Sequence, residues 1–140
     1  MRIFIDTSAF IALLVSSERW HEACKKKYRE YADKNALFFT NMLVLSELYT
    51  RLIYDVGKRD CEKVIKQINK LKEEDKLRIF QLDPALLKET EKIMLRFGEH
   101  KLSFTDASIV VIAKTYDMDE IFTLDKDFRK VGLQDAGIVN

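Results

Sequence analysis

The chain has very few of the residues that interrupt regular structure. Its 140 residues include one proline and four glycines, the two residue types that break helices and strands most strongly. We therefore expect long regular elements, with helices predominating. The length suits one domain, and a hydrophobic fraction of 47% is sufficient for a folded core. We treat residues 1–140 as a single domain.

Cysteines, long apolar runs and an excess of one charge are also lacking. Cys24 and Cys61 show neither C-x-x-C spacing nor a disulfide framework, so we expect free thiols in a reducing compartment. No apolar run is long enough to span a bilayer, and no signal-peptide pattern precedes the first strand-like segment. These absences predict a cytoplasmic protein without membrane contact. The net charge of +1 does not by itself indicate a nucleic-acid-binding protein.

Short apolar segments alternate with helical patterns along the chain. We expect strands at 2–5, 36–39, 77–82 and 121–124, with a weak fifth strand at 138–139. Between them we expect helices over 8–15, about 20–31, 41–56, 60–74, 84–98 and 103–113; Thr40 or Asn41 caps the third. This order predicts an α/β domain of three layers. A mostly parallel central sheet of four or five strands would have helices on both faces.

Four acidic residues fall where such a sheet brings its strand ends together. Asp6 directly follows the first strand and Asp125 directly follows the fourth, while Glu47 lies in the helix after the second strand. Asp106 is in the first turn of its helix. Ligands of open parallel sheets bind outside the carboxyl ends of the strands. We therefore expect these carboxylates to gather at that edge.

Each acid also has a purely local interpretation. These are a helix cap at Asp6, an i,i+4 ion pair of Glu47 with Arg51, a capping box of Asp106 with Ser103, and a cap at Asp125 or Asp127. Taken together, the acids favour a metal site. Ionised carboxylates are rarely buried unless they are paired or bound to metal, and converging carboxylates repel one another. Ligands that are all oxygen favour Mg²⁺ or Mn²⁺ over zinc.

The order of the motifs resembles that of the PIN-domain ribonucleases, and especially the VapC toxins of toxin–antitoxin pairs. The motifs are Asp6-Thr7-Ser8, a lone Glu47, Ser-Phe-Thr-Asp-Ala at 103–107 and Thr-Leu-Asp-Lys-Asp-Phe at 123–128. The resemblance runs from Met1 to about Val131. It implies a PIN-like fold and an acidic quartet of Asp6, Glu47, Asp106 and Asp125 that holds Mg²⁺ or Mn²⁺ and is catalytic.

The resemblance also implies supporting residues, a reaction and partners. Ser8 and Thr123 match polar positions that orient the acids, and Asp127 matches a position that is acidic in part of the family. The implied reaction is hydrolysis of RNA, with a metal-activated water attacking the phosphodiester in line. The implied assembly is a homodimer that a small antitoxin protein blocks.

Basic and apolar residues suggest contacts for these partners. Arg51, Lys126, Arg129 and Lys130 lie near the acids in sequence and are candidates to hold RNA phosphates, with solvated surface charge as the alternative. A second set of residues either forms ordinary core or lines a dimer or antitoxin groove: Leu13, Leu14, Trp20, Tyr28 and Tyr31.

Two other functions compete with a metal-dependent ribonuclease. A phosphatase of the haloacid dehalogenase type also begins with a strand and an aspartate, but it needs a second aspartate where this chain has Ser8. A PIN-like module can also bind RNA or protein without cleaving, and the complete set of four acids disfavours that reading. Release of inorganic phosphate would support the former, and RNA binding without cleavage the latter.

Overall fold

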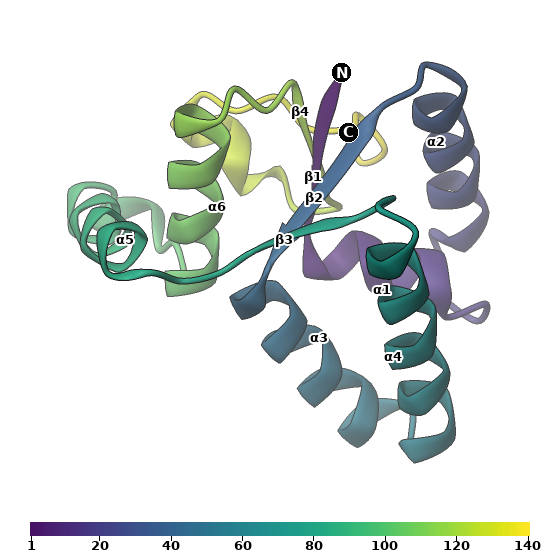
Figure 1. Ribbon diagram of the computed structural model, residues 1–140. Coiled ribbons are helices and arrows are strands. Elements are labelled where there is room, and N and C mark those ends of the chain that lie inside the picture. The colour runs from purple at the N-terminus through teal and green to yellow at the C-terminus, as the bar shows by residue number, and fades with distance from the viewer.

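The computed structural model describes residues 1–140 in full and confirms the four main strands (Figure 1). The first strand has the expected bounds, and the bounds of the other three differ from the expected ones by one or two residues. The elements in chain order are β1 (Arg2–Ile5), α1 (Thr7–Leu14), α2 (His21–Asp33), β2 (Leu37–Asn41), α3 (Met42–Asp55), α4 (Lys58–Glu73), β3 (Arg78–Phe80), α5 (Pro84–Arg96), the 3₁₀ turn η1 (Gly98–His100), α6 (Phe104–Thr115), β4 (Glu120–Phe122) and the 3₁₀ segment η2 (Lys126–Val131).

All four strands are parallel and form one sheet in the order β3-β2-β1-β4. The chain builds outward from β1 through β2 to β3, and then returns to the other side of β1 to place β4. Figure 1 shows α5 and α6 on one side of the sheet and α1, α2 and α4 on the other. The predicted three-layer α/β architecture is therefore confirmed.

The core is centred on β1, because this strand has a neighbour on each side and helices over each face. Ile3 and Phe4 of β1 are fully buried, as are Ile109, Val110 and Ile112 of α6. An almost wholly apolar helix is expected where a helix packs between a sheet and a further helix. Burial of α6 begins at Ala107, so Asp106 lies in a partly buried first turn at the start of a buried helix.

The weak fifth strand expected at 138–139 is absent, which corrects that prediction. Instead, Asp135 forms an isolated parallel bridge with Ile121 of β4. Arg129 explains why pairing stops there. Its guanidinium donates to Asp135 Oδ1 at 3.1 Å and to the carbonyl of Val139 at 2.6 Å, so a side chain holds the backbone that a further strand would use.

Two predictions from the scarce residue types are also tested by the structure. Cys24 and Cys61 are both free and buried, as expected. None of the helices combines the length and the apolar character that crossing a bilayer would require.

Candidate active site

Asp6 lies at the carboxyl edge of the sheet, between β1 and β4. Its backbone N–H donates to the carbonyl of Phe122 at 3.0 Å, which continues the pairing of the two strands. Its carboxylate accepts a hydrogen bond from the backbone N–H of Thr7 at 2.7 Å and so caps α1. Asp6 is only 6% exposed. The expected helix cap is thus present on a carboxylate that is also buried at the sheet edge.

Two hydroxyls orient the Asp6 carboxylate. Thr123 Oγ1 donates to Asp6 Oδ2 at 2.8 Å, and because a hydroxyl has one proton, Ser8 Oγ must be the donor in its 3.2 Å contact with Thr123 Oγ1. Ser8 Oγ in turn accepts from Leu124 N at 2.9 Å. This chain of donors directs positive hydrogen ends toward Asp6. The predicted orienting role of Ser8 and Thr123 has the geometry that it requires.

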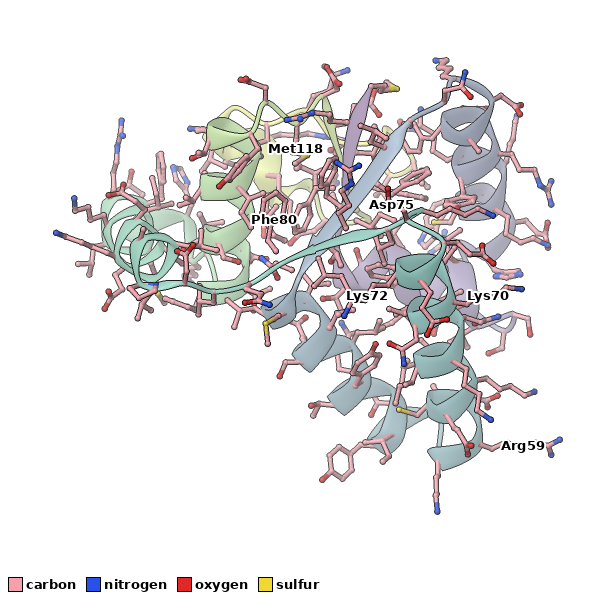
Figure 2. The ribbon with its side chains drawn as sticks, viewed as in Figure 1. Arg59, Lys70, Lys72, Asp75, Phe80 and Met118 are labelled. Carbon is pink, nitrogen blue, oxygen red and sulfur yellow. The ribbon has the colours of Figure 1, made fainter.

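Glu47 and Asp106 approach the same edge on two helices. The helix α3 begins directly after β2, which places Glu47 in its second turn. Asp106 is the third residue of α6, and α6 starts at the carboxyl edge because the segment after it returns to the beginning of β1, where Asp119 N donates to the carbonyl of Arg2. Figure 2 shows Met118 toward that opposite edge. Both helices therefore begin near Asp6.

The local roles expected for these acids are all present. Asp106 and Ser103 form a complete capping box, and Glu47 Oε1 lies 3.8 Å from Arg51 Nη1. Asp125 caps η2 by accepting from Asp127 N at 2.9 Å. Asp125 does not follow β4 directly, because the strand ends at Phe122 and two residues intervene. A capping role leaves each carboxylate with oxygen lone pairs that can bind a further group.

Electrostatics show that the acids interact with one another. The pKa of Asp6 is raised to about 7, chiefly by burial and also by the charges of Asp106 and Glu47, which together outweigh the hydrogen bonds of Thr123 and Thr7. Burial also raises the pKa of Asp106, and the charges of Asp125 and Asp127 add to that effect. Asp6, Glu47, Asp106 and Asp125 are therefore linked by repulsion into one acidic cluster, the group to which this name refers below.

The acidic cluster fits a hard divalent cation by its chemistry. Its donors are carboxylate oxygens, which Mg²⁺ and Mn²⁺ prefer. Within the cluster only Glu47 has a basic partner, so the repulsion felt by Asp6 and Asp106 is uncompensated by any ion pair. In this structure no three side chains of metal-binding types converge as a finished coordination shell. The assignment of residues that would share one ion is therefore part of the proposed function.

The four basic candidates for RNA binding are all engaged with protein groups. Arg51 lies near Glu47, and Lys130 forms a 2.9 Å ion pair with Asp127, whose pKa it lowers by hydrogen bonding. Lys126 donates to the carbonyl of Asn140 at 3.0 Å, and Arg129 is held by Asp135 as described above. Arg51 and Lys130 therefore stay beside acids of the site, whereas Lys126 and Arg129 also anchor the C-terminal segment.

The second set of predicted contact residues divides into core and surface. Tyr31 is 1% exposed and packs edge-on against Phe122, so it belongs to the core. Leu13, Leu14 and Tyr28 instead line a groove of about 380 Å³ between α1 and α4. Trp20 is half-buried and lies at the start of α2, outside that groove. The groove, and not the whole aromatic stripe, is the candidate docking surface.

Sequence reasoning missed a polar pair beside the acids. Asn41 was expected only as a helix cap, yet its amide also donates to Ser108 Oγ of α6 at 2.9 Å. Thr40 is fully buried and donates to the carbonyl of Ile5 at 3.0 Å. The available signal was Ser108 itself, a polar residue within an otherwise apolar stretch of helix, since such a residue needs a partner when it is buried.

Comparison with known proteins agrees with this architecture. A family model described as PIN domain matches residues 3–133 of the chain. Ribonuclease VapC6 of Methanocaldococcus jannaschii is 23% identical, with 92% of each chain covered.

Two crystal structures share the fold. VapC20 of Mycobacterium tuberculosis, described as a Sarcin-Ricin loop cleaving toxin, superposes with a TM-score of 0.79 at 24% identity, covering 94% of this chain and 95% of that one. VapBC2 of Rickettsia felis, solved with a DNA fragment from its promoter, gives a TM-score of 0.72 at 14% identity and covers 96% and 97%. At these identities the two structures support the fold alone.

Proposed function

Because the chain belongs to the PIN domain family, we propose that it is a metal-dependent endoribonuclease and the toxin of a toxin–antitoxin pair. The observation that carries the proposal is the acidic cluster at the carboxyl edge of the sheet, where burial and mutual repulsion raise the pKa values of Asp6 and Asp106. The similarity to ribonuclease VapC6 supports RNA as the substrate. Carboxylates that are forced together, with a basic partner for Glu47 alone, are suited to a divalent cation.

Asp6, Glu47, Asp106 and Asp125 would hold Mg²⁺ or Mn²⁺ in this proposal. The ion would supply a Lewis acid that activates a water molecule and stabilises charge on the phosphodiester during in-line attack. The protein's own contribution is orientation. Ser8 and Thr123 fix the direction of the Asp6 carboxylate, and the chain offers the site no serine–histidine or cysteine–histidine nucleophile pair.

The surroundings of the acidic cluster would bind the RNA backbone. Arg51 and Lys130 already lie within 4 Å of Glu47 and Asp127. RNA phosphates can replace those carboxylates as the partners of the two basic side chains. Asp127 acts here by holding Lys130, a supporting role that does not require it to touch metal. Arg129 and Lys126 remain candidates for weaker contacts at the edge of the same surface.

The proposed assembly is a homodimer inhibited by a small antitoxin. The groove between α1 and α4, lined by Leu13, Leu14 and Leu71, offers an apolar surface for a segment of the antitoxin. The similarity of the fold to VapBC2 of Rickettsia felis is consistent with a partner of this kind. A short reading frame beside the gene would identify the antitoxin.

The proposal is tested by incubating the purified protein with total RNA and Mg²⁺ or Mn²⁺, with EDTA as the control, and mapping new RNA ends. We expect discrete new ends that require the divalent ion. RNA binding without cleavage under every divalent ion would instead establish a non-catalytic module. Release of inorganic phosphate from small phosphate esters, with intact RNA, would reverse the assignment in favour of a phosphatase.

A further inference from the structure

A buried amide joins the two elements that carry Glu47 and Asp106. Asn41 ends β2, caps α3 and is 2% exposed. Its Oδ1 accepts from Val44 N at 2.9 Å, and its Nδ2 donates at 2.9 Å to the fully buried Ser108 of α6. This is the one side-chain hydrogen bond between the β2–α3 segment and α6. It crosses between the elements close to the carboxyl edge where the acidic cluster lies.

The chemistry of the groups determines the direction of every bond in this connection. Ser108 has one hydroxyl proton, which goes to the carbonyl of Thr105 at 2.6 Å because a carbonyl can only accept. Ser108 Oγ must therefore accept from Asn41. The amide cannot be reversed, since its oxygen is needed by Val44 N. The connection ends on the backbone of the residue that precedes Asp106.

The connection opposes movement of the two elements that it joins. Glu47 on α3 and Asp106 on α6 both act on the charge of Asp6, so each helix brings a like charge toward that buried carboxylate. This repulsion favours movement of either helix away from Asp6, and movement of one helix alone separates it from the other. Separation would break the bond between Asn41 and Ser108 and leave buried polar atoms unpaired, which is costly. The hydrogen bond thus holds the elements that carry Glu47 and Asp106 close together before any cation neutralises those two acids.

We propose that Asn41, acting through Ser108, is a positioning residue that holds Glu47 and Asp106 at the separation needed to share one divalent cation. The inference rests on the proposed function, because that function supplies the cation. Asn41 is assigned a positional role and not that of a metal ligand, because its buried amide is directed to Val44 and Ser108.

Two substitutions separate this role from helix capping. Asn41→Ser keeps a side chain that caps helices well but is too short to reach Ser108. Ser108→Ala removes the acceptor and leaves the cap intact. Mn²⁺ binding is measured without RNA, from the paramagnetic resonance signal of free Mn²⁺. We expect each variant to lose about tenfold in Mn²⁺ affinity. The double variant should lose no more, because the bond between Asn41 and Ser108 is already broken by either change alone.

The matched control is a variant that removes a helix cap far from the acidic cluster. Asp83 caps α5 by accepting from Leu86 N at 2.8 Å, and it lies beside Thr115 and Tyr116, at the end of α6 remote from Asp106. Asp83→Ala should lower the melting temperature and leave the Mn²⁺ affinity unchanged. RNA cleavage by Asn41→Ser should approach the wild-type rate at high Mn²⁺, a recovery that general destabilisation would not produce.

The outcomes distinguish the inference from the proposed function. Wild-type Mn²⁺ affinity in the folded variants, or losses that add in the double variant, would overturn the positioning role alone. If Asn41→Ser does not fold, Ser108→Ala decides the question by the same measurements. A wild-type protein that binds no Mn²⁺ would overturn the proposed function and this inference together.

Discussion

At the scale of single residues, each acid of the cluster has a local role and a position in the site. Asp6 caps α1, Asp106 completes a capping box and Asp125 caps η2. These roles use backbone N–H donors, which also favour the ionised form of a carboxylate. The raised pKa values of Asp6 and Asp106 show that burial and like charge outweigh those donors. Capping therefore positions the carboxylates without relieving their repulsion.

Asp106→Asn separates charge from capping. Asparagine keeps an oxygen that can accept from Ser103 N, so the capping box and the fold should persist. Removing the charge should reduce RNA cleavage by about 100-fold or more, while the metal-free protein should be at least as stable as the wild type, because repulsion by Asp125 and Asp127 is relieved. RNA cleavage against Mn²⁺ concentration, beside a melt in EDTA, measures both. A folded variant with wild-type cleavage at low Mn²⁺ would reject the metal role.

The raised pKa of Asp6 predicts how stability depends on pH. With a pKa of about 7 in the folded protein and 3.8 in the unfolded chain, the folded state holds a proton that the unfolded state has released between these values. The free energy of unfolding of the metal-free protein should therefore fall as the pH rises through this window. Asp106 acts in the same direction. Carboxyls with lowered pKa values, such as Asp127, change the free energy of unfolding only at lower pH.

The measurement is a series of thermal melts in EDTA from pH 5 to pH 8. The wild-type melting temperature should decline across the series, and Asp6→Asn should flatten the decline. Added Mn²⁺ should stabilise the wild type more strongly as the pH rises, because metal and proton compete for the carboxylates. A flat wild-type profile would contradict the buried, repelled state of Asp6.

At the scale of elements, the order β3-β2-β1-β4 creates the site. From β1 the chain continues to β2 on one side of it, and only later returns to place β4 on the other side. The strand order therefore reverses direction between β1 and β4. Such switch points open a crevice at the carboxyl edge of a parallel sheet. Asp6 and Thr123 meet there, and Asp125, which caps η2, lies close enough for its charge to act on Asp106. The C-terminal segment supports η2 through the pair of Arg129 and Asp135.

Arg129→Ala tests whether this pair serves the fold or RNA. The side chain of Asp135 is 7% exposed and would lose its charged partner, so the melting temperature should fall. If Arg129 serves only the fold, the salt dependence of RNA binding should be unchanged in the folded variant. A shallower salt dependence would mean that Arg129 neutralises an RNA phosphate. The double variant Arg129→Ala/Asp135→Ala is the control, and it should recover part of the lost stability.

At the scale of the whole molecule, the acidic cluster and the groove lie on different parts of the fold. The acids lie at the carboxyl edge of the strands, whereas the groove runs between α1 and α4 and is lined mainly by apolar side chains. Large apolar side chains are also exposed elsewhere, including Tyr54 on α3 and Leu95 on α5, each more than 80% exposed. Apolar side chains exposed singly are ordinary on protein surfaces, so the apolar lining of the groove is the feature that suggests a partner.

We expect the isolated chain to be a dimer. Light scattering during size-exclusion chromatography should give a mass near twice the 16.4 kDa of one chain. The dimer should persist on dilution into the micromolar range, and added antitoxin should increase the mass further. A monomer at every concentration, together with no small protein that co-purifies from the native host, would contradict the proposed assembly.

The local structure could be predicted from the sequence because it depends on residues a few positions apart. The scarcity of proline and glycine predicted long helices, Asp83-Pro84 predicted the start of α5, and Ser103 with Asp106 predicted the capping box. The ordered acidic motifs, through their family resemblance, predicted which residues belong to the site. The strand expected at 138–139 was also predicted from a local pattern. It does not form, and the carbonyl of Val139 instead accepts a hydrogen bond from Arg129.

Tertiary structure decided what depends on residues far apart in the chain. The placement of β4 beside β1 brings Thr123 to Asp6, across 117 positions, and no local pattern specifies that pairing. The same holds for Asn41 and Ser108, 67 positions apart. The pKa of Asp6 is raised to about 7 chiefly by burial, and burial is a property of packing. The sequence by itself determined which acids are present, and packing decided that they repel one another.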